Sequence, residues 1–206
     1  MTQRLKIPPT KSTLLVLRRQ VNFLQQGYAL LERKRELLTR LVSVQLKHYR
    51  TLRKEARTSL VEAYRCLGIT QMRMGSKQLY QAVLGVGPAL RVNILPRSSI
   101  GVEYPSVVTE TLPLQPMGLM GTDASFDETR LQLVRLATIL ANLGEAETAL
   151  RRMLAEQRKT QKRVNALKYN VIPRYQTTIR FIQNSLEEEE RNTLFQIKLL
   201  CAQGRE

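Results

Sequence analysis

The sequence predicts a mainly α fold, a long antiparallel two-helix coiled-coil hairpin with a small middle segment that contains a short helix and a β-hairpin. Both ends of the chain carry long apolar stripes at helical spacing, and most of the glycines and prolines lie between them. The 206 residues include no tryptophan and only 5% aromatic residues, which is little for the core of a compact globule of this length. We therefore divide the chain into an N-terminal helix (1–67), a middle segment (68–124) and a C-terminal helix (125–206).

The N-terminal helix is predicted from about Ser12 to Leu67, after a stop at Pro8 and Pro9. Residues taken alternately three and four apart form a nearly unbroken apolar stripe, which is typical of a coiled-coil seam. Only Arg35, Gln45 and Ser59 interrupt it. The seam residues are Leu14, Leu17, Val21, Leu24, Tyr28, Leu31, Arg35, Leu38, Val42, Gln45, Tyr49, Leu52, Ala56, Ser59, Ala63 and Cys66.

The middle segment combines turn residues with short β-favouring runs. We expect a short helix near Thr70–Leu84, then a small β-hairpin or ribbon, then an irregular loop. The β-favouring runs are Ala89–Leu95, Ile100–Tyr104 and Val107–Leu112. They are separated or followed by breakers that include Pro96, Gly101, Pro105, Pro113, Pro116, Gly118 and Gly121.

The C-terminal helix is predicted to open with a capping box, Ser125 to Glu128. Pro173 removes one backbone donor and is expected to bend or loosen its turn. Two long stripes joined by a small middle segment fold most simply as an antiparallel hairpin in which each stripe buries the other. The second stripe comprises Leu133, Leu136, Leu140, Leu143, Leu150, Leu154, Val164, Leu167, Val171, Tyr175, Ile179, Ile182, Leu186, Ile197 and Leu200.

A formal net charge of +16 raises the question of an anionic partner. The basic residues are spread in ones and twos, without the long like-charge block of a basic tail, so a solvated helical surface is the favoured interpretation. Tyr28, Tyr49 and Tyr175 lie on the stripes, where they pack rather than stack on bases. We therefore expect no nucleic-acid partner.

Two cysteines cannot form a disulfide framework, and in an antiparallel hairpin Cys66 and Cys201 lie near opposite ends. The chain shows no signal peptide, lipidation motif or apolar run of 18 residues. These features predict a reduced, cytoplasmic protein without a membrane span.

The residues that usually carry chemistry are missing or misplaced. Gly75-Ser-Lys77 lacks the order of a phosphate-binding loop, and the single histidine, His48, excludes a two-histidine metal site. Cys66 is most simply a small core residue. The run Glu187–Glu190 points to several sides of a helix, and Glu187 can pair with Arg191 at i,i+4. We predict no catalytic, cofactor-binding or metal-binding residue.

Two motifs suggest a family. Pro9-Thr-Lys11 followed by Gly27–Leu38 (GYALLERKRELL) resembles the N-terminal signature of the D subunit of the V-type rotary ATPases and ATP synthases. The run Arg163–Arg174 (RVNALKYNVIPR), then Thr178–Ile182 and Leu186–Arg191, resembles the second signature of that family. The motif residues that the resemblance implies for a shaft are Gly27, Leu30, Leu31, Lys34, Arg35, Arg163, Asn165, Ala166, Leu167, Ile172, Pro173, Arg174, Thr178 and Ile179. Glu32, where lysine is common, and Lys168, where glutamate is common, depart from the pattern and put one salt bridge in doubt.

The resemblance implies a non-catalytic central rotor shaft without cofactors, peripheral to the membrane within a membrane-bound complex. Its implied partners are the catalytic and non-catalytic head subunits (A and B type), the small F subunit of the central stalk and a funnel-shaped rotor-docking subunit. The tail residues Leu194, Ile197 and Leu200 would form a bearing inside the head. Such a shaft transmits torque between the head and the ion-translocating membrane rotor.

Three alternatives stay open at this point. The γ shaft of F-type enzymes is also a helical hairpin, but its middle domain is larger than the segment found here. A basic coiled-coil RNA-binding protein would lose its ligand steeply as salt rises. A tether or filament protein would form parallel homodimers rather than an intramolecular hairpin.

Overall fold

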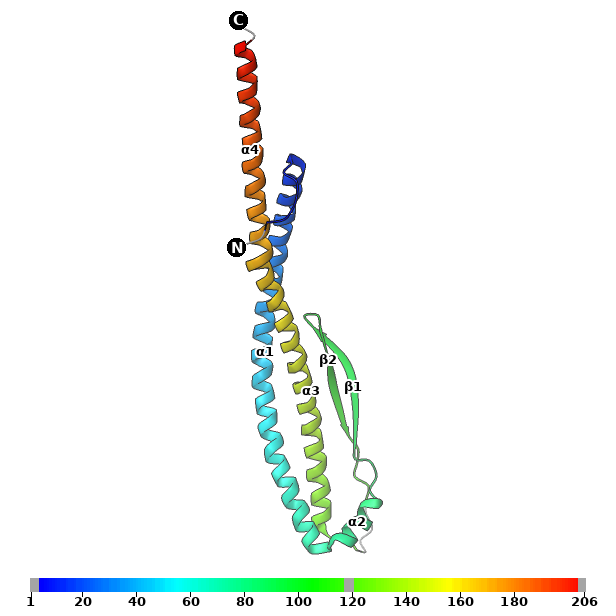
Figure 1. The fold of residues 1–206 in the computed structure, drawn as a ribbon. Helices are drawn as coiled ribbons and strands as arrows, with labels where there is room; N and C mark the ends of the chain where they lie inside the picture. The colour runs from blue at the N-terminus through cyan, green and yellow to red at the C-terminus, as the bar shows by residue number, and fades with distance from the viewer. Residues whose placement is uncertain (1–3, 117–120, 204–206) are drawn as a thin grey trace. The chain divides into compact units, whose positions relative to one another are not determined.

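The computed structural model describes residues 4–116 and 121–203, with side chains described as far as Cys201. Parts of the predicted segments lie outside the described residues: 1–3 and 204–206 at the ends, and 117–120, with Gly118, in the loop. Seven elements follow one another (Figure 1): α1 (Lys11–Met74), α2 (Ser76–Leu84), β1 (Leu90–Ser99), β2 (Val102–Thr111), α3 (Ala124–Ala166), the π-helical turn η1 (Leu167–Val171) and α4 (Ile172–Gln203).

The predicted fold class is confirmed, with long helices, a short helix and one two-stranded antiparallel sheet. The first helix is longer than expected, because it passes Gly68 and ends at Met74. Gly75 separates it from α2 with a φ of 75°, which a residue with a side chain rarely adopts. The short helix predicted near Thr70–Leu84 is therefore divided between the end of α1 and α2.

Contacts divide the chain into two compact units. One unit contains Met1–Leu37 and Gln157–Glu206, and the other contains Leu38–Glu156. In the first unit, Lys11 contacts Glu190 whereas Arg35 contacts Gln161, so the N-terminal part of α1 runs antiparallel to the C-terminal helices. The second unit contains the remainder of α1, α2, the sheet and most of α3.

The predicted seam of α1 is confirmed. Each of its sixteen residues is buried or half-buried, including the polar interruptions Arg35, Gln45 and Ser59. Leu38 is fully buried and packs with Met153 of α3 and Val102 of β2 in the second unit. Spacing along one helix thus predicts which side of α1 faces its neighbours.

In the second unit, a tightly connected hairpin packs beside α3 (Figure 1). Ser99 pairs with Val102, and the two-residue turn Ile100-Gly101 has positive φ at both positions, 51° and 73°. Strand β2 faces the helix, because the Val107 N–H donates to Glu145 Oε2 at 2.7 Å and Arg152 donates to the Glu103 carbonyl at 2.8 Å. Between its two end residues every residue of β1 is exposed. The three predicted β-runs form two ten-residue strands, with Pro96 opposite Pro105.

The predicted capping box at Ser125 is wrong. Helix α3 begins at Ala124, and the Ser125 hydroxyl donates to Asp123 Oδ2 at 2.8 Å from within the first turn. Asp123 Oδ1 also accepts the Ala124 N–H at 2.8 Å. The hydrogen bond from Ser125, followed by that from Arg73, lowers the pKa of Asp123. Asp123 is the residue that satisfies the start of the helix, because its carboxylate precedes the first free backbone donors.

Part of the predicted second apolar stripe is also wrong. Leu133 and Leu140 are 42% and 46% exposed, whereas the small residues Ala146 and Ala149 are buried. The predicted stripe is based on the positions of the leucines and leaves out these small residues. In the second unit α3 packs against both α1 and the sheet, so short side chains occupy its closest contacts.

The predicted disturbance at Pro173 is confirmed and takes a specific form. The five residues before α4 form a π-helical turn, in which the Ile172 N–H donates to the Leu167 carbonyl five residues earlier. Proline has no N–H and its ring opposes the carbonyl four residues before it. A π turn accommodates this by inserting one extra residue into the helical ladder.

Candidate functional site

The N-terminal segment folds back along α4 within the first unit. The Leu5 N–H donates to Thr178 Oγ1 at 3.1 Å, and the Arg4 guanidinium lies 4.5 Å from the centroid of the Phe181 ring. Lys11 Nζ then lies 2.8 Å from Glu190 Oε1. These three contacts attach residues 4–11 to α4 between Thr178 and Glu190.

All of the motif residues named from the sequence fall in this same unit. Arg35 donates to Gln161 Oε1 at 3.2 Å, and Gln161 Nε2 donates to Asn165 Oδ1 at 2.9 Å. The two signatures therefore meet side by side. Thr178 is buried, Leu30, Arg163, Asn165 and Ala166 are exposed, and the others are half-buried: Gly27, Leu31, Lys34, Arg35, Leu167, Ile172, Pro173, Arg174 and Ile179.

The two positions that depart from the family pattern each have a local neighbour. Glu32 pairs with Arg35 three residues later through Oε1, while its Oε2 is buried without a hydrogen-bond partner. Lys168 Nζ lies 5.4 Å from the centroid of the Tyr169 ring. Arg35 thus joins Glu32 on its own helix to Gln161 on the opposite one.

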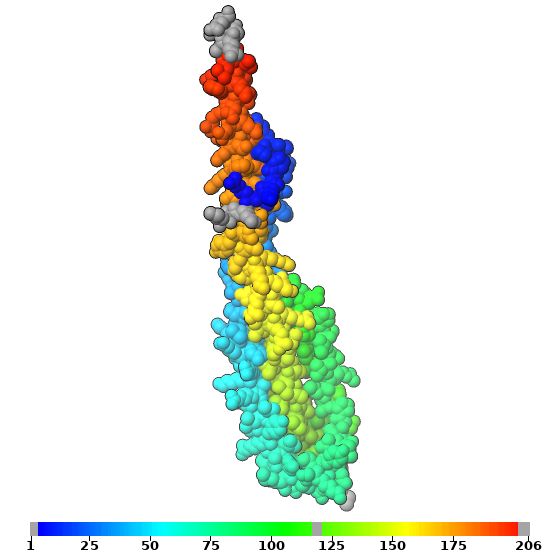
Figure 2. All heavy atoms as spheres, in the orientation of Figure 1, coloured from blue at the N-terminus to red at the C-terminus, as the bar shows by residue number. Residues whose placement is uncertain are grey.

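The end of α4 is exposed. All described side chains from Glu187 to Cys201 are exposed, and the face of this red segment drawn in Figure 2 is uncovered. Five of them are large and apolar. Besides Phe195 and Leu199, these are Leu194, Ile197 and Leu200, which are 61%, 51% and 68% exposed. The predicted pairing of Glu187 with Arg191 is confirmed at 3.8 Å. Beyond the Lys11–Glu190 ion pair, the tail is an apolar-containing surface without a partner in the described part of this chain.

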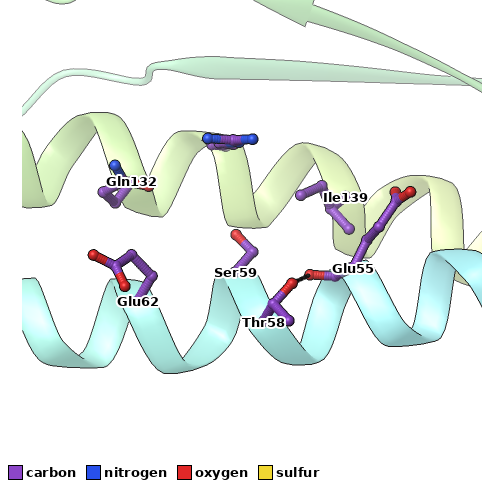
Figure 3. A pocket seen from close by; sticks show the side chains of 7 residues that line it. Glu55, Thr58, Ser59, Glu62, Gln132 and Ile139 are labelled. Atoms are coloured by element: carbon purple, nitrogen blue, oxygen red, sulfur yellow. Dashed lines mark hydrogen bonds between the residues drawn. The ribbon is translucent and has the colours of Figure 1, made fainter.

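A polar groove of about 500 Å³ lies between α1 and α3 in the second unit (Figure 3). Thr58 donates to the carbonyl of Glu55 on its own helix, so its hydroxyl is already used. Ser59 Oγ is buried without a partner, but no histidine lines the groove to activate it.

The other chemical candidates have structural explanations. Cys66 is buried as predicted, and His48 is exposed. In the described ranges, no three histidine, cysteine or acidic residues are placed to hold a metal ion. Within the same ranges no helix is both long and apolar enough to span a membrane.

Antiparallel pairing of α1 with the C-terminal helices in the first unit, together with an exposed, apolar-containing helix end, defines a helical-hairpin protein. Comparison with known proteins identifies its family. The model of the family described as the D subunit of ATP synthase matches residues 13–202. The chain belongs to this ATP synthase D-subunit family.

Individual relatives agree over nearly the whole length. The D subunit of the A-type ATP synthase of Pyrococcus furiosus is 31% identical over 206 residues, 98% of this chain and 96% of the relative. The D subunit of the V-type ATP synthase of Thermotoga neapolitana is 32% identical over 197 residues, 95% and 97% of the two chains. The A-type D subunit of Methanosphaera stadtmanae is 32% identical over 198 residues, 94% and 92%.

These relatives decide between the functions considered from the sequence. The D subunit is the central-stalk subunit of A-type and V-type ATPases. The comparisons give no support to an RNA-binding or tethering protein.

Sequence reasoning missed the residues that connect the two signatures. Gln161 lies just before the second signature and bridges Arg35 to Asn165, while Leu5 and Arg4 lie before the first. Antiparallel pairing of the two long helices would place Gln161 opposite Arg35 once the register of the pair is known. The fold-back of residues 4–10 has no comparable signal, because it depends on one backbone donor and one buried hydroxyl.

Proposed function

We propose that the chain is the non-catalytic rotor shaft of an A/V-type ATPase or ATP synthase, and that it transmits torque between the nucleotide-processing head and the ion-translocating membrane rotor. The observation that carries this proposal is the joining of both signatures in one antiparallel helix pair through Arg35, Gln161 and Asn165. Torque passes along a shaft only if its helices cannot slide or unwind past each other. Interlocking side chains and hydrogen bonds across the pair resist both motions.

The exposed end of α4 supports a bearing inside the head. Leu194, Ile197 and Leu200 share one side of the helix and have no partner in the described part of this chain. Exposed leucine and isoleucine at this spacing are suited to the apolar wall of a ring of A- and B-type head subunits. The motif residues named above then belong to the paired part of the shaft, and the F subunit and a funnel-shaped docking subunit complete the stalk.

A disulfide lock tests rotation. Cys201 is exposed, so Cys201→Ser first removes a competing thiol. Gln196→Cys, at an exposed position, is then paired with a cysteine on the facing wall of a head subunit. Closing the bond should reduce steady-state ATP turnover of a coupled assembly severely, and reduction should restore it.

A second lock excludes an unwound tail as the explanation for a weak effect. Gln176 is exposed and lies within the paired part of α4, so Gln176→Cys provides this lock. The same shaft cysteines without the wall cysteine form the matched control and should leave turnover unchanged. Full turnover with both locks closed would identify a static strut and reject the rotor proposal.

A further inference from the structure

A second groove on the α1–α3 pair differs in charge from the groove of Figure 3. It has a volume of about 530 Å³ and lies within the second unit. Four cations of α1 line it, namely Arg50, Arg53, Lys54 and Arg57. The remaining lining is apolar and includes Leu60 of α1 and Leu140 of α3. No acidic side chain lines it.

The four cations are arranged against the preference of an isolated helix. Arg50 and Lys54 are four residues apart, as are Arg53 and Arg57, and like charges at this spacing destabilise a helix. No aspartate or glutamate lies three or four residues from any of the four. Within α1 these four cations therefore repel one another, and no acidic residue at helical spacing offsets the repulsion.

Residues of other elements do not offset this repulsion either. In the described part of the chain none of the four makes an ion pair, whereas Arg73, Arg130 and Arg151 of the same unit do. The nearby leucines are left partly uncovered as well, since Leu60 is 39% and Leu140 is 46% exposed. A concave surface with unpaired cations and uncovered leucines is complementary to a surface with carboxylates and apolar side chains.

We propose that this groove binds an acidic amphipathic helix of another protein chain. Its carboxylates would face the four cations, and its apolar side chains would cover Leu60 and Leu140. Arg50 and Arg57 are two helical turns apart, so carboxylates at positions i, i+4 and i+7 match the spacing of the cations. A protein partner fits better than nucleic acid, because the lining has no aromatic side chain on which a base could stack. The proposal rests on the proposed function only in that the chain works within a multi-subunit assembly.

The experiment uses the assembly purified with the full chain. A photo-crosslinking phenylalanine analogue replaces Leu60, and the crosslinked peptide is identified by mass spectrometry. We expect a peptide of another subunit with at least three acidic residues at helical spacing. The double variant Arg53→Glu/Arg57→Glu should lower the crosslink yield at least tenfold.

Arg91→Glu/Arg97→Glu is the matched control, because both arginines are exposed on β1 and the charge change is identical. It should leave the crosslink intact. The groove variant should not unfold the isolated chain, since it converts the like-charge pairs 50/53 and 54/57 into opposite-charge pairs and leaves the pairs 50/54 and 53/57 like-charged as before. Its melting temperature should equal or exceed that of the unchanged chain.

Three results would overturn the proposal: equal losses in both double variants, a crosslink to RNA that nuclease removes, or a crosslink to a segment without acidic residues. The subunit composition of the purified assembly separately tests the proposed function. If head subunits co-purify and the groove does not crosslink, only the groove proposal fails.

Discussion

Lys11 Nζ lies 2.8 Å from Glu190 Oε1, and this ion pair joins the first residue of α1 to α4. The hydrogen bond from Lys11, and then its charge, lowers the pKa of Glu190. The hydrogen bond to Glu190, and then its charge, raises the pKa of Lys11. Both side chains are largely exposed, so the pair positions the start of α1 rather than contributing much to global stability.

The first prediction concerns the pH range of this contact. Because the pKa of Glu190 is lowered, its contribution is present above the ordinary carboxyl pKa and is lost as pH falls through the lowered value. Because the pKa of Lys11 is raised, its contribution is present below the ordinary lysine pKa and is lost as pH rises through the raised value. Lys11→Ala should therefore speed hydrogen exchange near residues 5–13 at neutral pH, and the difference should vanish in acid. Lys198→Ala, on the exposed end of α4, is the control and should change nothing there; an equal effect would mean that general charge is responsible.

A buried hydroxyl cluster gives the second prediction. Thr70 Oγ1 lies 2.7 Å from Thr129 Oγ1, and it also contacts the Cys66 carbonyl at 3.0 Å and the Ser125 carbonyl at 2.9 Å. Thr70→Val leaves buried polar groups without their partner, so the free energy of unfolding should fall by about 1–3 kcal/mol. Denaturant unfolding measures this change.

The control for the hydroxyl cluster is Thr58→Val, because Thr58 is exposed and bonds only to its own helix. Thr58→Val should lower the free energy of unfolding by much less than Thr70→Val. Combining Thr70→Val with Thr129→Val should cost less than the sum of the two single changes, since both partners are then removed together. Strict additivity would show that the two hydroxyls are not coupled.

The hairpin turn gives the third prediction. Ile100 has a φ of 51°, and a β-branched residue is strained in this left-handed region. Ile100→Asn supplies the Asn-Gly pair that two-residue hairpin turns prefer, so the hairpin should gain about 1 kcal/mol. Amide exchange of Val102 and its neighbours should slow. The same substitution at exposed Ile94, within β1, should instead weaken the hairpin.

Much of the fold could be predicted because helical spacing is local information. The seam of α1 follows from one rule applied along one segment, and it holds at every position. The end of α1 could not be predicted in this way. Gly68 marks the expected boundary, but Thr70 two residues later is buried against α3. Its hydrogen bonds to Ser125 and Thr129 stabilise the helix beyond Gly68.

The surfaces were harder to predict than the core. The basic residues of the further groove are visible in the sequence, but Leu140 comes from α3, where leucine spacing places it on the buried stripe. Residues of different helices form one surface only after the register is fixed. The motif residues follow from resemblance, and their joining through Gln161 depends on the same register.

The cysteines give the fourth prediction. Cys66 is buried and Cys201 is exposed. A maleimide reagent should label Cys201 rapidly in the native chain and Cys66 only after unfolding, with rates at least tenfold apart. Cys201→Ser should abolish the fast phase. Equal labelling rates of the two thiols in the native chain would contradict the burial of Cys66.

The π-helical turn before Pro173 gives the last prediction. A π turn is an α-helix with one extra residue, so it can be removed by a deletion without turning the residues beyond it. Deleting exposed Asn170 together with Pro173→Ala should convert Leu167–Val171 into continuous α-helix and keep Thr178 and Ile182 buried. Thermal unfolding should then stay within a few degrees of the unchanged chain.

Deleting exposed Gln176 together with Pro173→Ala is the control for the π turn. It removes a residue beyond the turn and rotates everything after it by about 100° around the helix axis. Thr178 and Ile182 lie just after the deletion and are at most 1% exposed, so this rotation should take both out of the core of the first unit and lower the melting temperature strongly. Pro173→Ala alone should preserve the π turn, because packing of these two residues fixes the register even when the missing donor is restored. If both deletions destabilise equally, the turn is not an inserted residue but a distortion caused by proline, and Pro173→Ala alone should then abolish it.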